Sequence, residues 1–195
     1  GRDVVDRIDE LGGVVDVSHC GTQTTLDAIE YADAPVAVTH STCQSVAPHY
    51  RGKSDEEMEA LAAADGYMGI AALPWFIAPD SDEPTLDVLL DHLEHAVSVL
   101  GPDRVGIGTD FFPADTRFPS ALLEYYTQHI VDLGFDREMV EQRTTIAGGL
   151  GAFETYENWP AIREAVERRF SPREAEGILG ENFLRYWSRS TDGHE

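Results

Sequence analysis

Short apolar runs alternate along the first 110 residues with stretches in which apolar side chains recur every three or four positions. Nearly continuous apolar runs are typical of parallel strands buried on both faces, and they cover residues 14–19, 36–40, 67–73 and 105–109. The stretches with the helical period cover residues 2–11, 24–31, the segment from 54 onward and 85–100. The pattern therefore predicts four βα units that share one parallel sheet.

Local signals at the helix ends support these boundaries. Ser54 with Glu57, and Ser171 with Glu174, have the spacing of capping boxes, and Thr85 stands at the start of the long helix. Beyond residue 110 the pattern is mostly helical, with helices predicted at 121–133, 160–170, 172–179 and 181–187. We expect a single partial domain over 1–187, made of βα units over 1–110 and a helical segment over 111–187, followed by a polar tail over 188–195.

The number of units limits the architecture. A complete (β/α)8 barrel of the TIM type usually needs about 250 residues and twice as many strands. The chain has 195 residues and starts inside a predicted helix without a methionine. We therefore expect an α/β fold that is the carboxyl-terminal half of such a barrel, with four parallel strands plus C-terminal helices; an open four-stranded sheet is the alternative.

Charge narrows the list of partners. The chain has 36 acidic and 14 basic residues, a formal charge of −22, and Lys53 is its single lysine. Such a balance repels nucleic acids and anionic membranes, so we expect neither as a partner. It is also typical of halophilic proteins, in which salt screens repulsion between carboxylates, although an ordinary acidic enzyme is the alternative. No run is long enough for a membrane span, and we expect a cytoplasmic protein, a targeting segment upstream of Gly1 remaining compatible.

Three predicted strands end in a side chain suited to metal chemistry. His19 and His40 end the first two strands, 21 residues apart, and Asp110 follows the fourth. The carboxyl ends of parallel barrel strands meet at one edge, where barrel enzymes have their active sites. Imidazole nitrogen binds zinc, and a carboxylate at this edge can bind metal or transfer protons. We therefore predict that His19 and His40 bind one metal ion, with Asp110 as a catalytic group.

Other candidates have two interpretations each. Arg51, in a small basic island, can bind a substrate carboxylate through paired hydrogen bonds or form a surface ion pair. His92 and His95 share one face of a helix outside the sheet, which favours a structural or solvated role. The two cysteines, Cys20 and Cys43, are expected to be buried rather than reactive.

Four segments in order resemble the membrane (renal) dipeptidase family of zinc peptidases. They are Asp16-Val17-Ser18-His19, residues 34–41, residues 106–111 and residues 180–185. The resemblance implies a (β/α)8 barrel with two bridged zinc ions that hydrolyses the peptide bond of dipeptides. By position, it implies that His19 and His40 hold the second zinc, that Asp110 transfers protons, and that Arg51 binds the substrate's terminal carboxylate.

The chain departs from the family pattern in two places. The first-strand His-x-Asp ligands and the bridging glutamate have no match before His19, so only one partial zinc site is expected here. A second acid that often follows the last strand is replaced by phenylalanine in Asp110-Phe111-Phe112-Pro113, which changes the expected substrate preference.

These observations predict a metal-dependent dipeptidase whose isolated 195-residue chain is inactive or nearly so. Two rivals remain open. One is another barrel metallohydrolase that acts on cyclic amides or lactones. The other is a non-catalytic half-barrel that binds a partner, or forms a homodimer, through its open sheet edges.

Overall fold

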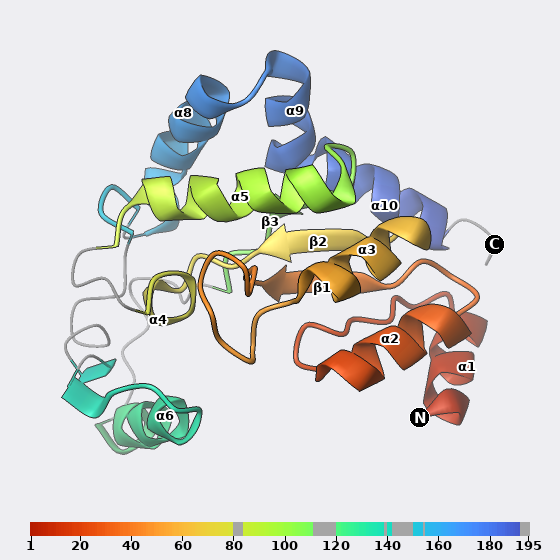
Figure 1. Cartoon of the computed structure of the whole chain (residues 1–195), viewed down its shortest axis with the longest axis horizontal. Helices are drawn as coiled ribbons and strands as arrows, with labels where there is room; N and C mark the ends of the chain where they lie inside the picture. The colour runs from red at the N-terminus through yellow and green to blue at the C-terminus, as the bar shows by residue number, and fades with distance from the viewer. Residues whose placement is uncertain (80–83, 111–119, 139, 142–149, 154, 192–195) are drawn as a thin grey trace.

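The computed structural model describes residues 1–79, 84–110, 120–138, 140–141, 150–153 and 155–191. Within these residues one parallel sheet forms, in the order β1 (Ala37–Ser41), β2 (Tyr67–Ile70), β3 (Val105–Ile107). The strands follow the predicted second, third and fourth apolar runs, and all three are parallel. Figure 1 shows β1 and β2 pointing the same way. The sequence therefore predicted the α/β class and the parallel sheet, but one strand too many.

The first predicted strand forms a single bridge rather than a strand. Asp16 pairs with Ala37, which accepts a hydrogen bond from Val17 N–H at 2.9 Å and donates one to Val15 C=O at 2.9 Å. Beyond this point the side chain of Asp16 accepts the N–H of Thr39 at 3.1 Å, so the backbone ladder stops. The segment still lies beside β1, and the prediction of four strands was wrong because side chains take over the pairing.

The apolar runs are buried because helices cover one face of the sheet. The core joins Met68 and Ile70 of β2 to side chains of α3 (Asp55–Ala63) and α5 (Leu86–Leu100), all nearly inaccessible to solvent. Figure 1 shows these two helices in front of the sheet, with α1 (Arg2–Glu10) and α2 (Thr22–Tyr31) at the β1 side. This helix layer holds the strands in register, and therefore fixes where their carboxyl ends lie.

The predicted helix starts are mostly confirmed. Both capping boxes form, with Ser54 bonded to Glu57 N–H and Ser171 bonded to Glu174 N–H. Thr85 is the N-terminal cap residue of α5, but its side chain makes no capping hydrogen bond.

The chain ends in η1 (Tyr156–Asn158), α8 (Trp159–Arg169), α9 (Pro172–Glu176), the π-helical turn η2 (Gly177–Glu181) and α10 (Asn182–Thr191). Helix α8 packs on α5, whereas η2 and α10 contact the strands of the sheet. Tyr186 of α10 packs on Tyr67 and Ala37, and its hydroxyl donates to Pro35 C=O at 2.9 Å. Helix α10 thus continues through residues 188–191 of the predicted tail, whereas residues 192–195 lie outside the described part of the chain.

Two helices lie beyond the carboxyl ends of the strands, the short α4 (Pro74–Ile77) and the longer α6 (Ser120–Asp132) (Figure 1). The third apolar run, predicted as strand to residue 73, ends as β2 at Ile70, and Pro74 then starts α4. No helix among the described residues is both long and apolar enough to cross a bilayer.

Candidate metal and substrate site

The structure brings the two predicted metal ligands together. Nε2 of His19 lies 2.8 Å from Nε2 of His40, and the two ring centres are 4.9 Å apart. His19 ends the segment beside β1, and His40 belongs to β1 itself. The pKa of His19 is lowered by burial and by the positive charges of Arg51 and His40, which favours the neutral ring that metals bind.

This pair fits zinc as a partial donor set. Two ring nitrogens bound to one tetrahedral zinc ion, each at about 2.0–2.1 Å, lie about 3.3 Å apart, so a small opening of the present pair would admit the ion. Across the described part of the chain, no group of three or more His, Cys, Asp or Glu side chains is placed to hold a metal. A metal held by this pair would therefore have an incomplete donor set among the described residues.

A break in the β1 ladder gives His40 its position. The register between β1 and β2 shifts between Val38 and Ser41, which turns the Thr39 carbonyl toward the neighbouring strands. A Cβ on Gly69 would lie 2.2 Å from this oxygen, and one on Gly108 would lie 1.8 Å from it. The absence of side chains at these two glycines therefore makes room for the irregular backbone that carries His40.

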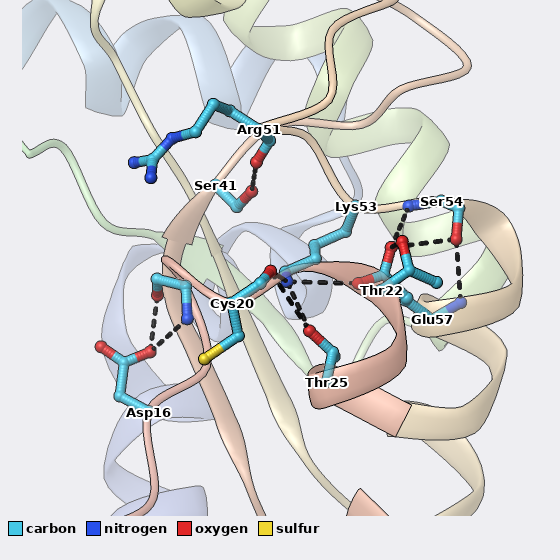
Figure 2. Close-up of polar contacts among 10 residues, drawn as sticks. Asp16, Cys20, Thr22, Thr25, Ser41, Arg51, Lys53, Ser54 and Glu57 are labelled. Atoms are coloured by element: carbon cyan, nitrogen blue, oxygen red, sulfur yellow. Dashed lines mark hydrogen bonds and ion pairs between the residues drawn. The ribbon is translucent and has the colours of Figure 1, made fainter. Parts of the chain in front are cut away.

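Arg51 lies in the loop after β1, at the cleft that His40 and Asp110 also line. Its carbonyl accepts the Ser41 hydroxyl at 3.0 Å (Figure 2). Its guanidinium lies over the ring of Phe76, at 5.5 Å from the ring centre. Its Nε is buried with no hydrogen-bond partner among the described residues. The ion pairs in that part of the chain do not include Arg51, so the alternative of a surface ion pair is not seen there.

His49 fastens the Arg51 loop to the segment after α6. Its Nδ1 accepts the Arg51 N–H at 3.2 Å, so its Nε2–H donates to Leu133 C=O at 3.2 Å. The ring stacks on Phe135 with centres 4.4 Å apart, and burial lowers its pKa. Sequence reasoning missed this role, since it depends on a contact between positions 84 residues apart.

Asp110 follows β3 at the same edge of the sheet. Its φ of +52° lies in the left-handed region, which aspartate tolerates better than most residues and which often marks functional sites. Its negative charge acts on the pKa values of His19 and of Tyr126 in α6, which places the carboxylate near both side chains. The neighbouring Phe111 and Phe112, which distinguish the sequence from the family pattern, lie outside the described residues.

The single lysine is buried beside this site rather than exposed. Lys53 Nζ donates to Cys20 C=O at 2.9 Å, to Thr25 Oγ1 at 2.7 Å and to Glu57 Oε1 at 3.2 Å (Figure 2). Its side chain is 2% exposed, as is that of Glu57. Lys53 thus joins the loop after His19 to the loop that carries Arg51. The one sign of this role in the sequence was that Lys53 is the single lysine of the chain.

His92, His95 and Cys43 have structural roles. His92 is fully buried, its Nδ1 accepts the Cys43 N–H at 3.0 Å, and its Nε2–H donates to Ile77 C=O at 3.0 Å. His95 contacts Asp55 at 2.8 Å on the helix layer. Cys43 is buried, which raises the pKa of its thiol to about 12, and Cys20 is half-buried. These findings agree with the structural interpretation of His92, His95 and Cys43.

The side chains of Asp16, Ser18 and Thr39 form a hydrogen-bonded set next to the two histidines. The carboxylate of Asp16 accepts hydrogen bonds from Ser18 and Thr39, and the Thr39 hydroxyl also contacts Nδ1 of His40 at 2.8 Å. These hydrogen bonds hold the pKa of Asp16 below its usual value, although burial acts in the opposite direction. Sequence reasoning did not single out Asp16 or Thr39, and their positions next to the strand-end histidines are the signal it passed over.

The fold agrees with that of solved metallopeptidases. A structure of a metallo peptidase from Rhodobacter sphaeroides, liganded with a phosphinate mimic of the dipeptide L-Ala-D-Ala, superposes with a TM-score of 0.75. The alignment covers 97% of this chain and 46% of that one, at 23% identity. A likeness at this identity establishes the fold: an α/β architecture shared with metallopeptidases.

Sequence comparison supplies the family. The model of the membrane dipeptidase family, peptidase family M19, matches residues 1–133, so the chain belongs to this family. Dipeptidase tcpJ of Claviceps purpurea is 32% identical over 57% of this chain and 26% of its own length. An uncharacterized dipeptidase of Schizosaccharomyces pombe is 28% identical over 100% of this chain and 40% of its own length. The chain therefore spans less than half the length of these curated relatives.

Proposed function

We propose that this chain supplies part of the active site of a zinc-dependent dipeptidase. The observation that carries the proposal is the convergence of His19 and His40 at 2.8 Å, at the edge of the sheet where Asp110 and Arg51 also lie. Family membership and relatives named as dipeptidases support it. The architecture that goes with this proposal is the carboxyl-terminal half of a (β/α)8 barrel.

In this proposal His19 and His40 hold one zinc ion through their Nε2 atoms. When bound, zinc supplies Lewis-acid polarisation of the scissile carbonyl and lowers the pKa of water. Asp110 accepts a proton from the attacking water and delivers it to the leaving amine, a role suited to its position at the strand end. A second zinc, with its bridging carboxylate, requires ligands beyond the two imidazoles.

Arg51 binds the free carboxylate of the dipeptide. A planar guanidinium forms two parallel hydrogen bonds to a carboxylate, and here it is steadied by Phe76, while Ser41 and His49 hold its backbone. Because the carboxylate is fixed at one end, only a substrate with one peptide bond between this group and the metal position is expected to fit. This is the structural basis we propose for dipeptide selectivity.

The coding sequence upstream of Gly1 gives the first test. The proposal expects a His-x-Asp motif after a first strand and a glutamate on a later strand, which together complete a two-zinc site. The second test is hydrolysis by the full-length product of the gene, metal-free and zinc-loaded, with dipeptides, lactones and cyclic amides. Zinc-dependent cleavage of dipeptides alone supports the proposal. Cleavage of lactones or cyclic amides alone, or a zinc-indifferent oligomer without activity, would replace it with one of its rivals.

Arg51→Met tests the carboxylate role directly. Loss of a charge-assisted hydrogen-bonded pair costs about 1.5–3 kcal/mol, so we expect KM for dipeptides to rise roughly 10- to 100-fold with a smaller change in kcat. Steady-state kinetics of the full-length product measure both constants. A dipeptide amidated at its carboxyl end is the control, because it lacks the partner of Arg51 and should respond little to the substitution. Equal KM values for wild type and variant on the free dipeptide would reject this role.

A further inference from the structure

Asp16 accepts an unusual number of hydrogen bonds for a side chain outside the predicted site. Its Oδ1 accepts Ser18 N–H at 3.0 Å, the Ser18 hydroxyl at 2.5 Å and Thr39 N–H at 3.1 Å. Its Oδ2 accepts the Thr39 hydroxyl at 2.6 Å. An ionised carboxylate only accepts hydrogen bonds, so both hydroxyl protons point at Asp16.

This proton count determines the direction of the next hydrogen bond. Oγ1 of Thr39 lies 2.8 Å from Nδ1 of His40, but its single proton is already given to Asp16. The remaining arrangement has Nδ1–H of His40 donating to the lone pair of Thr39. Ser18 cannot supply a different proton, since its own hydroxyl proton goes to Asp16 and its oxygen accepts the His40 N–H at 3.1 Å.

We propose that Asp16, acting through the Thr39 hydroxyl, holds His40 in the tautomer protonated at Nδ1 and so directs the bare Nε2 at the metal position. Asp16 is then a positioning residue. Without metal, Nε2–H of His19 donates to this lone pair across the 2.8 Å gap; with metal, the same lone pair becomes a ligand. The inference rests on the proposed zinc site for its consequence, but the tautomer itself does not require zinc.

A purely structural role for Asp16 makes a different prediction. Asparagine at this position is nearly the same size and can still accept the N–H groups of Ser18 and Thr39. Its amide would donate to Thr39 Oγ1, which frees the hydroxyl proton for Nδ1 of His40 and moves the ring proton to Nε2. If the role of Asp16 is only structural, Asp16→Asn leaves the His40 tautomer unchanged. If Asp16 has the proposed role, the substitution switches the tautomer.

The experiment uses the 195-residue chain with 15N-labelled histidine. Nitrogen NMR spectra of the metal-free protein at pH 8 report which nitrogen of His40 carries the proton. Zinc affinity is then measured by calorimetry at the same pH. For the wild type we expect the Nδ1–H tautomer; for Asp16→Asn we expect the Nε2–H tautomer and zinc binding weakened roughly 10- to 100-fold.

Three further variants complete the design. Asp55→Asn removes a carboxylate 2.8 Å from another histidine, His95, and should change neither the His40 tautomer nor zinc affinity. If Asp16→Asn does not fold, Thr39→Val removes the same link and should weaken zinc binding, while Thr39→Ser should restore it.

Two outcomes overturn the proposal: an Nε2–H tautomer of His40 in the wild type, or an unchanged tautomer in a folded Asp16→Asn protein. If the tautomer changes as expected but the wild type binds no zinc, the proposed metal site fails while the positioning role of Asp16 stands.

Discussion

At the scale of single residues, the sequence predicted which candidate side chains lie together but not the side chains that support them. His19, His40, Arg51 and Asp110 were predicted from their places after apolar runs, and they do lie around one edge of the sheet. The support from Asp16 depends on a hydrogen bond from Thr39, which is 23 positions away in the sequence. This hydrogen bond forms only because the fold brings the two segments together. Periodicity carries no information about such contacts, so this layer of the site became visible only in the structure.

His92 yields a prediction about pH. Burial lowers its pKa from 6.5 in the unfolded chain to about 4, so the folded protein holds the neutral ring. The stabilisation is complete above pH 6.5 and is lost as the pH falls toward 4, because the unfolded chain is protonated first. Between pH 7.5 and pH 5 this residue should account for a loss of roughly 2 kcal/mol in the free energy of unfolding.

The measurement is urea unfolding of wild type and His92→Gln across that pH range. Lowered pKa values of His19 and His49 add to the slope in both proteins, so the difference between the two curves isolates His92. The variant should be less stable at pH 7.5 but should lose less stability on acidification. Parallel curves would show that His92 does not titrate differently in the two states.

At the scale of elements, the hydrophobic period predicted most helices and strands, and polar side chains decided where they end. The run 14–19 has the composition of a buried strand, yet Asp16 and Ser18 bond to the backbone of β1 and reduce the pairing to one bridge. The capping boxes of α3 and α9 were readable from sequence because they are local. The break in β1 was not readable from sequence, since it depends on Gly69 in β2 and on Gly108 directly after β3.

The buried pair of Lys53 and Glu57 predicts a large effect of one substitution. Lys53→Met leaves the Glu57 carboxylate buried without its cation, and breaking a buried pair in this way costs about 3–5 kcal/mol. Urea unfolding should show this loss, and Lys53→Met combined with Glu57→Gln should recover much of it. Arg7→Met is the matched control, because its partner Glu10 is exposed and the pair contributes at most about 1 kcal/mol. A Lys53→Met protein as stable as the wild type would contradict this account.

At the scale of the whole molecule, the sequence predicted the α/β class and the family, but its strand count was too high. The described residues form a three-stranded sheet with a helix layer, and the chain spans 46% of the Rhodobacter metallo peptidase with which it shares a fold. The domain limits of 1–187 stay a prediction. Net charge is a property of the whole chain, so its effect on stability must be measured on the intact protein.

A charge of −22 predicts that salt stabilises the fold. Repulsion between surface carboxylates is screened over about 8 Å at physiological ionic strength and about 3 Å at 1 M. The melting temperature should therefore rise as KCl increases from about 0.2 M to about 2 M, as expected of a halophilic protein. Calorimetry in KCl, with sorbitol at equal osmolality as the control for water activity, measures the effect. Full stability in dilute buffer, with no response to KCl, would identify an ordinary acidic protein.

Because Lys53 is buried, the chemical reactivity of its amino group measures how often the surrounding loops open. In the folded chain, a reagent that acylates amines finds no accessible lysine, because the single lysine side chain is 2% exposed. Acylation at Lys53 then requires the loops after His19 and around Arg51 to separate. Mass spectrometry in native buffer would measure the rate of that reaction. This rate gives the rate at which the site opens, and no label has to be introduced into the protein.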